Sequence, residues 1–163
     1  LNLEESLVLY ELDTGRNSGS IHDNQRKVMQ SKEIQNKVEK NVEHCKNMRE
    51  HVLRGNLNAF GKGLNTAWQL KRQFSSKISN TVIDEIYGFA RENGALGGKL
   101  LGAGGGGFFL FYVEDFKRNS FLKAMREKGL IETRFKFDLA GVRSWKNREE
   151  PTLNSKGEKN SEN

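Results

Sequence analysis

Gly97-Gly-Lys-Leu-Leu-Gly-Ala-Gly-Gly-Gly-Gly-Phe-Phe-Leu-Phe-Tyr-Val113 is the stretch of this sequence that says most about its fold. Two apolar segments flank a loop of six small residues, Gly102 to Gly107, and the pattern predicts two β-strands joined by a glycine-rich loop. The second segment is apolar on both faces, as expected of a central strand that helices cover on at least one side. The rest of the chain should therefore supply those helices and the neighbouring strands.

Periodicity predicts the elements on either side of this pair of strands. They are expected at residues 7–10 (strand), 23–55, 56–72 and 79–94 (three helices), 114–129 (helix) and 131–139 (strand). This order is that of an α+β fold, the ferredoxin-like split βαββαβ arrangement, with an enlarged multi-helix first connection. We expect one domain over residues 1–147. Residues 148–163 are almost without apolar side chains and are expected to form a disordered tail.

The spacing of apolar residues also predicts which helix faces are buried. Cys45 lies in the stripe of the first helix and is expected to be a small core side chain, and two glycines inside the second helix, Gly61 and Gly63, weaken the helical pattern there. The expected inward residues are Ile34, Val38, Val42, Cys45, Met48 and Val52 in the first helix, Leu57, Phe60, Leu64, Ala67 and Trp68 in the second, Val82, Ile83, Ile86, Phe89 and Ala90 in the third, and Phe116, Leu122 and Met125 in the fourth.

Composition excludes several classes of protein. The longest apolar run, Phe108 to Val113, is far short of the roughly 20 residues of a membrane helix, so no membrane association is expected. A single cysteine excludes an intrachain disulfide framework and suits the cytoplasm. The net charge of +6 permits phosphate binding, but the basic residues are interspersed with carboxylates, and no nucleic-acid partner is expected. The chain begins at Leu1 rather than Met and is expected to be a piece of a longer polypeptide.

The glycine loop is the main candidate for a functional site. Seven of the 17 glycines fall between Gly97 and Gly107. Residues without Cβ atoms adopt positive φ easily and turn backbone N–H groups toward one point, which makes a nest for an anion such as phosphate. A wide hairpin turn is the structural alternative, although one or two glycines would suffice for it. Lys99 either adds a positive charge beside the loop or is simply a solvent-facing strand lysine.

Other common sites are not supported by the sequence. No Gly-Lys-Ser/Thr ends the loop, and a strand rather than a helix follows it, so it is neither a P-loop nor a dinucleotide fingerprint. His44 and His51 are seven residues apart on one helix, about 10.5 Å along its axis, which is too far for one metal ion, and no metal site is expected.

Residues Lys99–Tyr112 resemble the third conserved motif of the GHMP small-molecule kinases, and the Gly-Gly-Lys-Leu-Leu-Gly-Ala-Gly-Gly-Gly-Gly-Phe form is most similar to that of the D-glycero-D-manno-heptose 7-phosphate kinases. The segments at residues 7–25 and 135–143 are also similar to parts of the C-terminal half of these sugar kinases. The resemblance implies ATP-dependent phosphorylation of a sugar or sugar phosphate. It also implies a site formed by Gly102, Ala103, Gly104, Gly105, Gly106, Gly107, Lys99 and Arg16.

The resemblance further implies a second, N-terminal domain as partner. That domain would carry the ATP-phosphate loop and bind most of the ATP and Mg²⁺, because no Pro-x-x-x-Gly-Leu-Gly-Ser-Ser-Ala segment and no catalytic residue is identified in this chain. This fragment by itself is therefore expected to be inactive. The alternative is a stand-alone ferredoxin-like module that binds a ligand or RNA without catalysis, since the fold alone does not determine function.

Overall fold

The computed structural model describes residues 2–12 and 32–145. Four antiparallel strands form one sheet in the order β2-β3-β1-β4, with β1 at Leu7–Leu12, β2 at Ala95–Leu100, β3 at Gly107–Val113 and β4 at Glu132–Thr133. Helices α3 (Lys32–Leu53), α4 (Leu57–Arg72) and α5 (Thr81–Glu92) lie between β1 and β2, and α6 (Asp115–Glu127) joins β3 to β4. A short helix, α1 (Asn2–Ser6), precedes β1. The expected split βαββαβ fold with a multi-helix first connection is confirmed.

The helix boundaries follow from local chemistry. The side chain of Asn56 accepts a hydrogen bond from the Ala59 amide at 3.2 Å, and that of Asn80 accepts one from the Ile83 amide at 2.9 Å, so both asparagines cap a helix as predicted. After α5, Gly94 has a φ of +114°, a conformation that ends a helix easily only when no Cβ is present.

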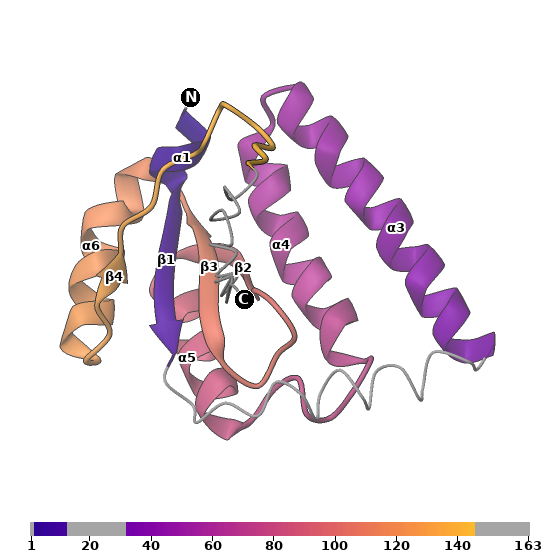
Figure 1. Ribbon diagram of the computed structural model, residues 1–163. Coiled ribbons are helices and arrows are strands. Elements are labelled where there is room, and N and C mark those ends of the chain that lie inside the picture. Colours follow the sequence, from indigo (N-terminus) through magenta and orange to yellow (C-terminus); the bar gives the residue numbers. More distant parts are fainter. Residues whose placement is uncertain (1, 13–31, 146–163) are drawn as a thin grey trace, which may run out of the picture.

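One face of the sheet is covered by α5 and α6 (Figure 1). Here the aromatic rings of Phe109 and Phe111 stack with centroids 4.6 Å apart, and Trp68 meets Phe109 edge to face at 5.3 Å. The side chains buried in this core include Val8, Tyr10, Leu12, Trp68, Ile78, Ile83, Tyr87, Ala90, Leu100, Phe109, Phe111, Val113, Phe121 and Met125. Strand β3 runs through its centre, in agreement with the prediction of a central strand.

Helix α4 packs against β2 at unusually short range, and glycines make this possible. A Cβ on Gly97 would overlap the carbonyl oxygen of Gly61 and lie 2.7 Å from the backbone nitrogen of Asn65. A Cβ on Gly61 would overlap the ring of Tyr112. The glycine inside the α4 pattern is therefore a packing requirement rather than a sign against the helix. A second apolar cluster, with Leu7, Met48, Leu64, Ala67 and Tyr112 buried, forms on this side of the sheet.

The predicted stripe of α3 is only partly buried, and the assignment of Cys45 to the core is wrong. Met48 is buried, whereas Val42 is 48% exposed and Cys45 is exposed. The cause is geometric: α3 and α4 diverge toward the start of α3, so only the last turns of α3 touch α4 (Figure 1). The expected start of this helix near Asp23 lies outside the described residues, and the structure describes only the backbone of Ile34.

Three further expectations are corrected by the structure. Val82 is 53% exposed and Phe116 is 79% exposed, because Ile83 and Phe121 occupy the inward positions of their helices. The predicted strand at 131–139 pairs with β1 only at Glu132 and Thr133. Beyond that point the Leu7 carbonyl accepts a hydrogen bond from Arg118 at 3.2 Å, and the Phe137 amide donates to the Glu4 carboxylate at 2.7 Å. These contacts, rather than further backbone hydrogen bonds to β1, hold the segment that follows β4.

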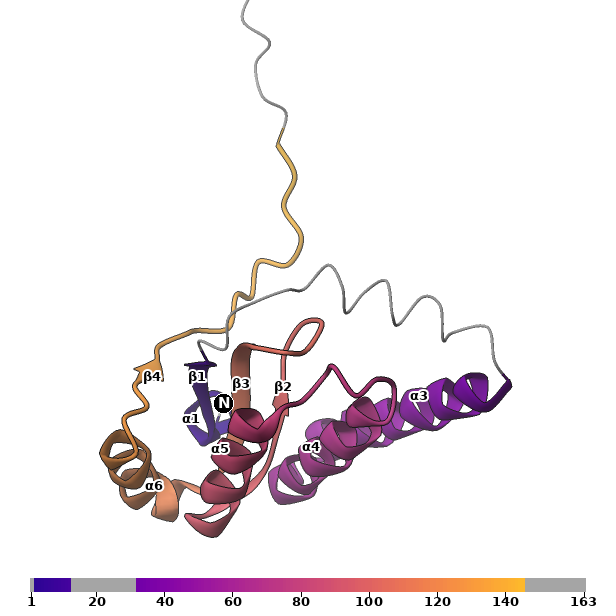
Figure 2. The same ribbon diagram turned by 90° about the horizontal axis from the view of Figure 1, so that it is seen from below.

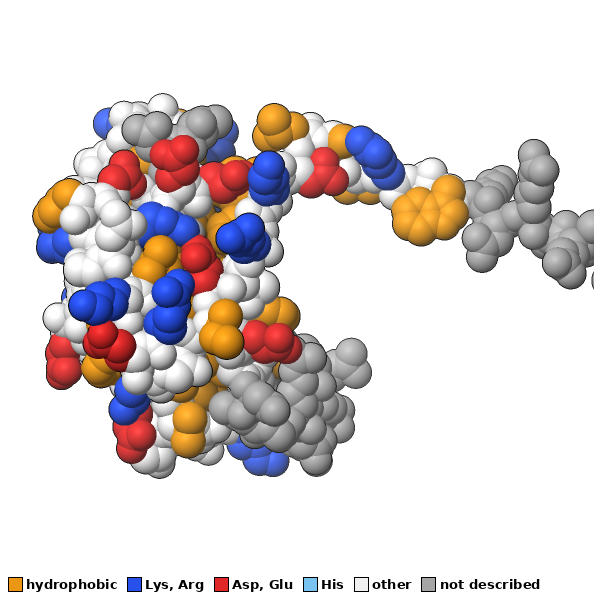
Figure 3. Space-filling view, turned by 90° about the vertical axis from the view of Figure 1, so that its left-hand side faces the viewer, with side chains coloured by type: hydrophobic (Ala, Val, Ile, Leu, Met, Phe, Trp, Pro, Cys, Tyr) orange, Lys and Arg blue, Asp and Glu red, His pale blue; other side chains and the backbone are white. Residues whose placement is uncertain are grey.

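The segment after Phe137 stands off the body of the domain as an arm that carries hydrophobic side chains (Figure 3). Leu139, Val142 and Trp145 are 91%, 101% and 82% exposed. None of the helices formed by residues 2–12 and 32–145 has the length and apolarity needed to cross a bilayer.

Candidate functional site

The glycine loop, residues 101–106, joins β2 to β3 at the end of the sheet where β1 finishes, since Leu12 pairs with Gly107. Seen from below, the loop bends away from α5 toward the other face of the sheet (Figure 2). The predicted glycine-rich connection between two strands is thus confirmed, and its location at an edge of the domain leaves one side of it open.

The backbone of the loop has the conformation that its glycines were expected to permit. The φ angles are +72° at Gly102, +118° at Gly104, +71° at Gly105, +152° at Gly106 and +102° at Gly107. At Gly104 there is also no room for a side chain, because a Cβ would lie 2.9 Å from the Cα of Ile78. A hairpin turn needs at most two such residues, so this run exceeds what a simple connection requires.

The loop is fastened to the domain from one side. The Gly105 amide donates to the Ile78 carbonyl at 2.9 Å, the Leu101 amide donates to the Phe108 carbonyl at 2.8 Å, and Ala103 packs against the main core. The Gly105 amide is thereby engaged within the protein and does not point at a ligand. Gly102 is exposed, while Gly104, Gly106 and Gly107 are buried, so the accessible part of the loop is its first half.

A lysine that the sequence analysis did not single out lies at the base of this loop. The Nζ atom of Lys71, in the last turn of α4, donates hydrogen bonds to the carbonyl oxygens of Leu100 at 2.8 Å and Gly102 at 2.5 Å. Burial, and secondarily the charge of Lys99, lower the pKa of Lys71 to about 8. The signal was present in the sequence: Lys71 continues the Leu64, Ala67 and Trp68 stripe of buried positions by one helical turn.

Of the other predicted site residues, Lys99 lies on β2 opposite Leu110 and is half-buried, close enough to Lys71 for its charge to be felt there. The structure therefore brings Lys99 and Lys71 together beside the loop. Arg16 lies outside the described residues. Within the described part of the chain, no three histidine, cysteine, aspartate or glutamate residues gather as a metal site would require.

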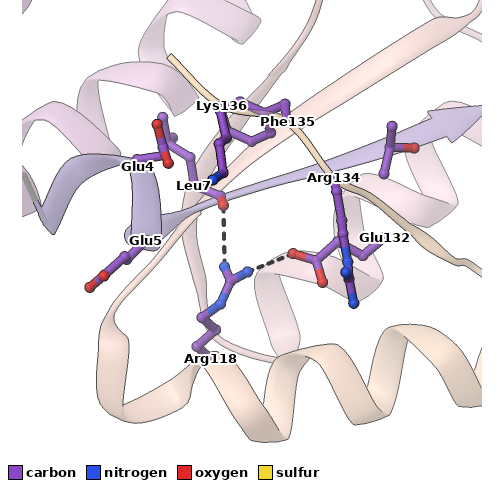
Figure 4. A pocket seen from close by; sticks show the side chains of 9 residues that line it. Glu4, Glu5, Leu7, Arg118, Glu132, Arg134, Phe135 and Lys136 are labelled. Atoms are coloured by element: carbon purple, nitrogen blue, oxygen red, sulfur yellow. Dashed lines mark hydrogen bonds and ion pairs between the residues drawn. The ribbon is translucent and has the colours of Figure 1, made fainter.

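A cavity of about 560 Å³ lies at the opposite end of β1 (Figure 4). Its charged side chains are Glu4, Glu5, Glu132, Arg118, Arg134 and Lys136. Arg118 points between β1 and the segment after β4, and it is held by Glu132 at 2.5 Å and by the Leu7 carbonyl. Three acidic and three basic groups give this cavity no preference for an anion. This cavity therefore does not compete with the glycine loop as the candidate phosphate site.

Comparison with known proteins agrees with this arrangement of loop and strands. The family model described as GHMP kinases C terminal matches residues 48–130, just over half of the chain, and this range includes α4, the glycine loop and Lys99. The chain belongs to the GHMP kinase C-terminal family. The resemblance noted in the sequence is thereby confirmed.

Individual members of the family show how far the similarity extends. This GHMP kinase C-terminal chain is 30% identical over 145 residues to the D-glycero-alpha-D-manno-heptose 7-phosphate kinase of Campylobacter jejuni, covering 88% of this chain and 42% of the relative. The crystal structure of L. major mevalonate kinase with R-mevalonate superposes with a TM-score of 0.66 at 22% identity, over 77% of this chain and 40% of that one.

Lactococcus lactis galactokinase complexed with galactose gives a TM-score of 0.58 at 19% identity, over 78% of this chain and 44% of that one. These two structural likenesses establish the fold alone. The chain spans less than half the length of the heptose kinase relative and of both solved structures.

Proposed function

We propose that this chain is the C-terminal, substrate-side domain of an ATP-dependent kinase that phosphorylates a hydroxyl of a sugar or sugar phosphate. The observation that carries the proposal is the run of positive-φ glycines beside Lys99, within a family of small-molecule kinases. The heptose kinase relative favours a heptose 7-phosphate as the acceptor. The domain would comprise residues 1–147, followed by the tail at 148–163.

The residues present fit a phosphoryl group better than a metal ion. Mg²⁺ prefers oxygen ligands, most often one or two carboxylates together with phosphates. The loop from Leu101 to Gly106 offers backbone groups and no carboxylate, with the ammonium groups of Lys99 and Lys71 beside it. In the proposed enzyme, Lys99 and the accessible start of the loop at Gly102 and Ala103 therefore hold phosphoryl oxygens, Gly104 to Gly107 set the path of the loop, and Arg16 contacts the acceptor. Bound Mg²⁺ would neutralise charge on the phosphates of ATP.

Catalysis in this proposal needs a second domain. Phosphoryl transfer depends on positioning and on charge stabilisation by metal and cationic groups around the transferred phosphoryl group, and one loop does not supply all of these. The exposed arm with Leu139, Val142 and Trp145 supports such a partner, because large apolar side chains so completely exposed are typical of a surface that another element covers. We assign this covering role to the preceding half of the same polypeptide, which also binds most of the ATP and Mg²⁺.

RNA binding, the other function that this fold allows, receives no support from the sheet. Recognition of RNA on such a sheet uses exposed aromatic side chains on which bases stack. Phe109 and Phe111 are 0% exposed, and Tyr112 is 3% exposed.

The experiment is a phosphorylation assay of the full-length protein with ATP, using heptose 7-phosphate, unphosphorylated heptose, galactose and mevalonate as acceptors. Gly102→Ala tests the loop, and Gly55→Ala is its matched control. Gly102 has a φ angle of +72° and Gly55 one of +68°. At both positions, a Cβ would have no neighbouring heavy atom within 4 Å. Both variants should be strained by about 1–2 kcal/mol, but only Gly102→Ala should lose turnover, by tenfold or more. Equal activity in the two variants would remove the loop from the proposed site.

A further inference from the structure

The ammonium group of Lys71 fastens the entry of the glycine loop to helix α4. Its two acceptors, the carbonyl oxygens of Leu100 and Gly102, lie on either side of Leu101, where β2 ends and the loop begins. A long, flexible side chain that makes two hydrogen bonds to backbone carbonyls holds the backbone between them in one conformation. The position of Gly102, the exposed glycine of the loop, is thus set by α4.

The charges around Lys71 are unbalanced in the described part of the structure. Lys99 is next in sequence to Leu100, whose carbonyl binds the Lys71 ammonium, and its charge acts on Lys71, while the loop from Leu101 to Gly106 has no ionisable side chain. On the side of α5, Asp84 is already paired with Arg72 at 2.7 Å and accepts from the Ser79 hydroxyl. Within residues 2–12 and 32–145, neither Lys71 nor Lys99 has a carboxylate within ion-pair distance.

Two ammonium groups brought together, one of them largely removed from water, repel each other and lose hydration. The two carbonyl oxygens bound by Lys71 offset part of this cost but carry no net charge, and a doubly charged anion would neutralise both ammonium groups at once. The neighbouring backbone at Gly102, which is exposed and has a positive φ, lets an anion approach closely.

We propose that Lys71 and Lys99 together form a binding subsite for a phosphoryl dianion at the entry of the glycine loop, with Lys71 also holding the loop in its binding conformation. This inference rests on the proposed kinase function for the identity of the ligand. The phosphoryl group is either that of the acceptor sugar phosphate or one of the nucleotide. Binding should be accompanied by proton uptake, because the anion favours the charged form of Lys71.

The test is isothermal titration calorimetry of the full-length protein with inorganic phosphate and, separately, with MgADP. Titrations at pH 8 in two buffers of different ionisation enthalpy measure the protons taken up. The wild type should take up about half a proton through Lys71, because a group with a pKa near 8 is half-protonated at that pH. Lys71→Met and Lys99→Met should each weaken binding tenfold or more, and Lys71→Met should abolish this uptake. Lys62→Met, at an exposed position of α4, should change affinity less than twofold.

Steady-state kinetics then identify the source of the phosphoryl group. If Lys71→Met raises KM for heptose 7-phosphate and leaves KM for ATP unchanged, the subsite binds the phosphoryl group of the acceptor. If it raises KM for ATP and leaves KM for heptose 7-phosphate unchanged, the subsite binds a phosphoryl group of the nucleotide. Lys71→Arg keeps the charge without releasing it near pH 8, so it should bind phosphate with no proton uptake through residue 71. Lys71→Arg therefore replaces Lys71→Met as the test variant if Lys71→Met fails to fold.

The outcomes separate this inference from the proposed function. The proposed subsite would be refuted if Lys71→Met bound phosphate with unchanged affinity and unchanged proton uptake. It would also be refuted if Lys71→Arg took up as many protons as the wild type. Either result would count even if the protein is an active sugar kinase. Phosphate binding that depends on Lys71, in a protein that phosphorylates no acceptor tested, would keep the subsite and remove the kinase assignment.

Discussion

Replacing Gly97 by alanine tests how closely the fold and the candidate site are connected. The new methyl group would overlap the carbonyl oxygen of Gly61 and lie 2.7 Å from the backbone nitrogen of Asn65, both on α4. A crowded side chain escapes by rotating, but a helix backbone does not. Helix α4 would have to move away from β2, and the bond from the Tyr87 hydroxyl to the Asn65 side chain and the bonds of Lys71 to the loop would be disturbed with it.

The magnitude of this effect follows from the same geometry. Overpacking costs about 1–3 kcal/mol when side chains adjust, and we expect the upper end, about 3 kcal/mol, because the contacting atoms are backbone. For a chain of this size that corresponds to a fall of roughly 6–12 °C in Tm. The assay is urea and thermal unfolding of the chain, followed by tryptophan fluorescence, in which the change should come from Trp68, 0% exposed, rather than from Trp145, which is already 82% exposed.

Gly88→Ala is the matched control for this substitution. Gly88 lies within α5, and no heavy atom lies within 4 Å of a Cβ built there. The same chemical change should therefore stabilise the chain, by about 0.5–1 kcal/mol, through the better helix propensity of alanine. If Gly97→Ala unfolds at the same urea concentration as the wild type, the close packing of α4 on β2 described above is wrong.

Two further predictions concern Cys45 and Lys71. Cys45 is exposed on α3 and should react with a thiol reagent in the native state as fast as after denaturation; protection until unfolding would restore its assignment to the core. For Lys71, burial on folding lowers the pKa from the ordinary lysine value of 10.5 to about 8. Below pH 8 both states bind the proton, and as pH rises above 8 the folded state loses it first, so the unfolding free energy should increase with pH between about 8 and 10. Lys71→Met should lack this increase when both proteins are titrated with urea across that range.

Local sequence patterns predicted the three longer strands, several helix ends and the glycine loop because each depends on a few neighbouring residues. The caps at Asn56 and Asn80 and the stop at Gly94 are examples, since a side chain or a missing Cβ acts within one turn. The order of the elements was then enough to identify the fold. The glycine run and Lys99 likewise located the candidate site within the chain.

Tertiary structure decided the properties that depend on what lies opposite a residue. Cys45 and Phe116 were both predicted on the apolar face of a helix, yet both are exposed because no element of the described domain covers them. The last strand pairs with β1 only as far as Thr133, and the Leu7 carbonyl is bound instead by Arg118, which is 111 residues away in sequence. Lys71 reaches the candidate site because the glycines of α4 and β2 let α4 pack close to the loop. Sequence periodicity specifies which face of an element is apolar, but burial and pKa depend on the partner that packs against that face.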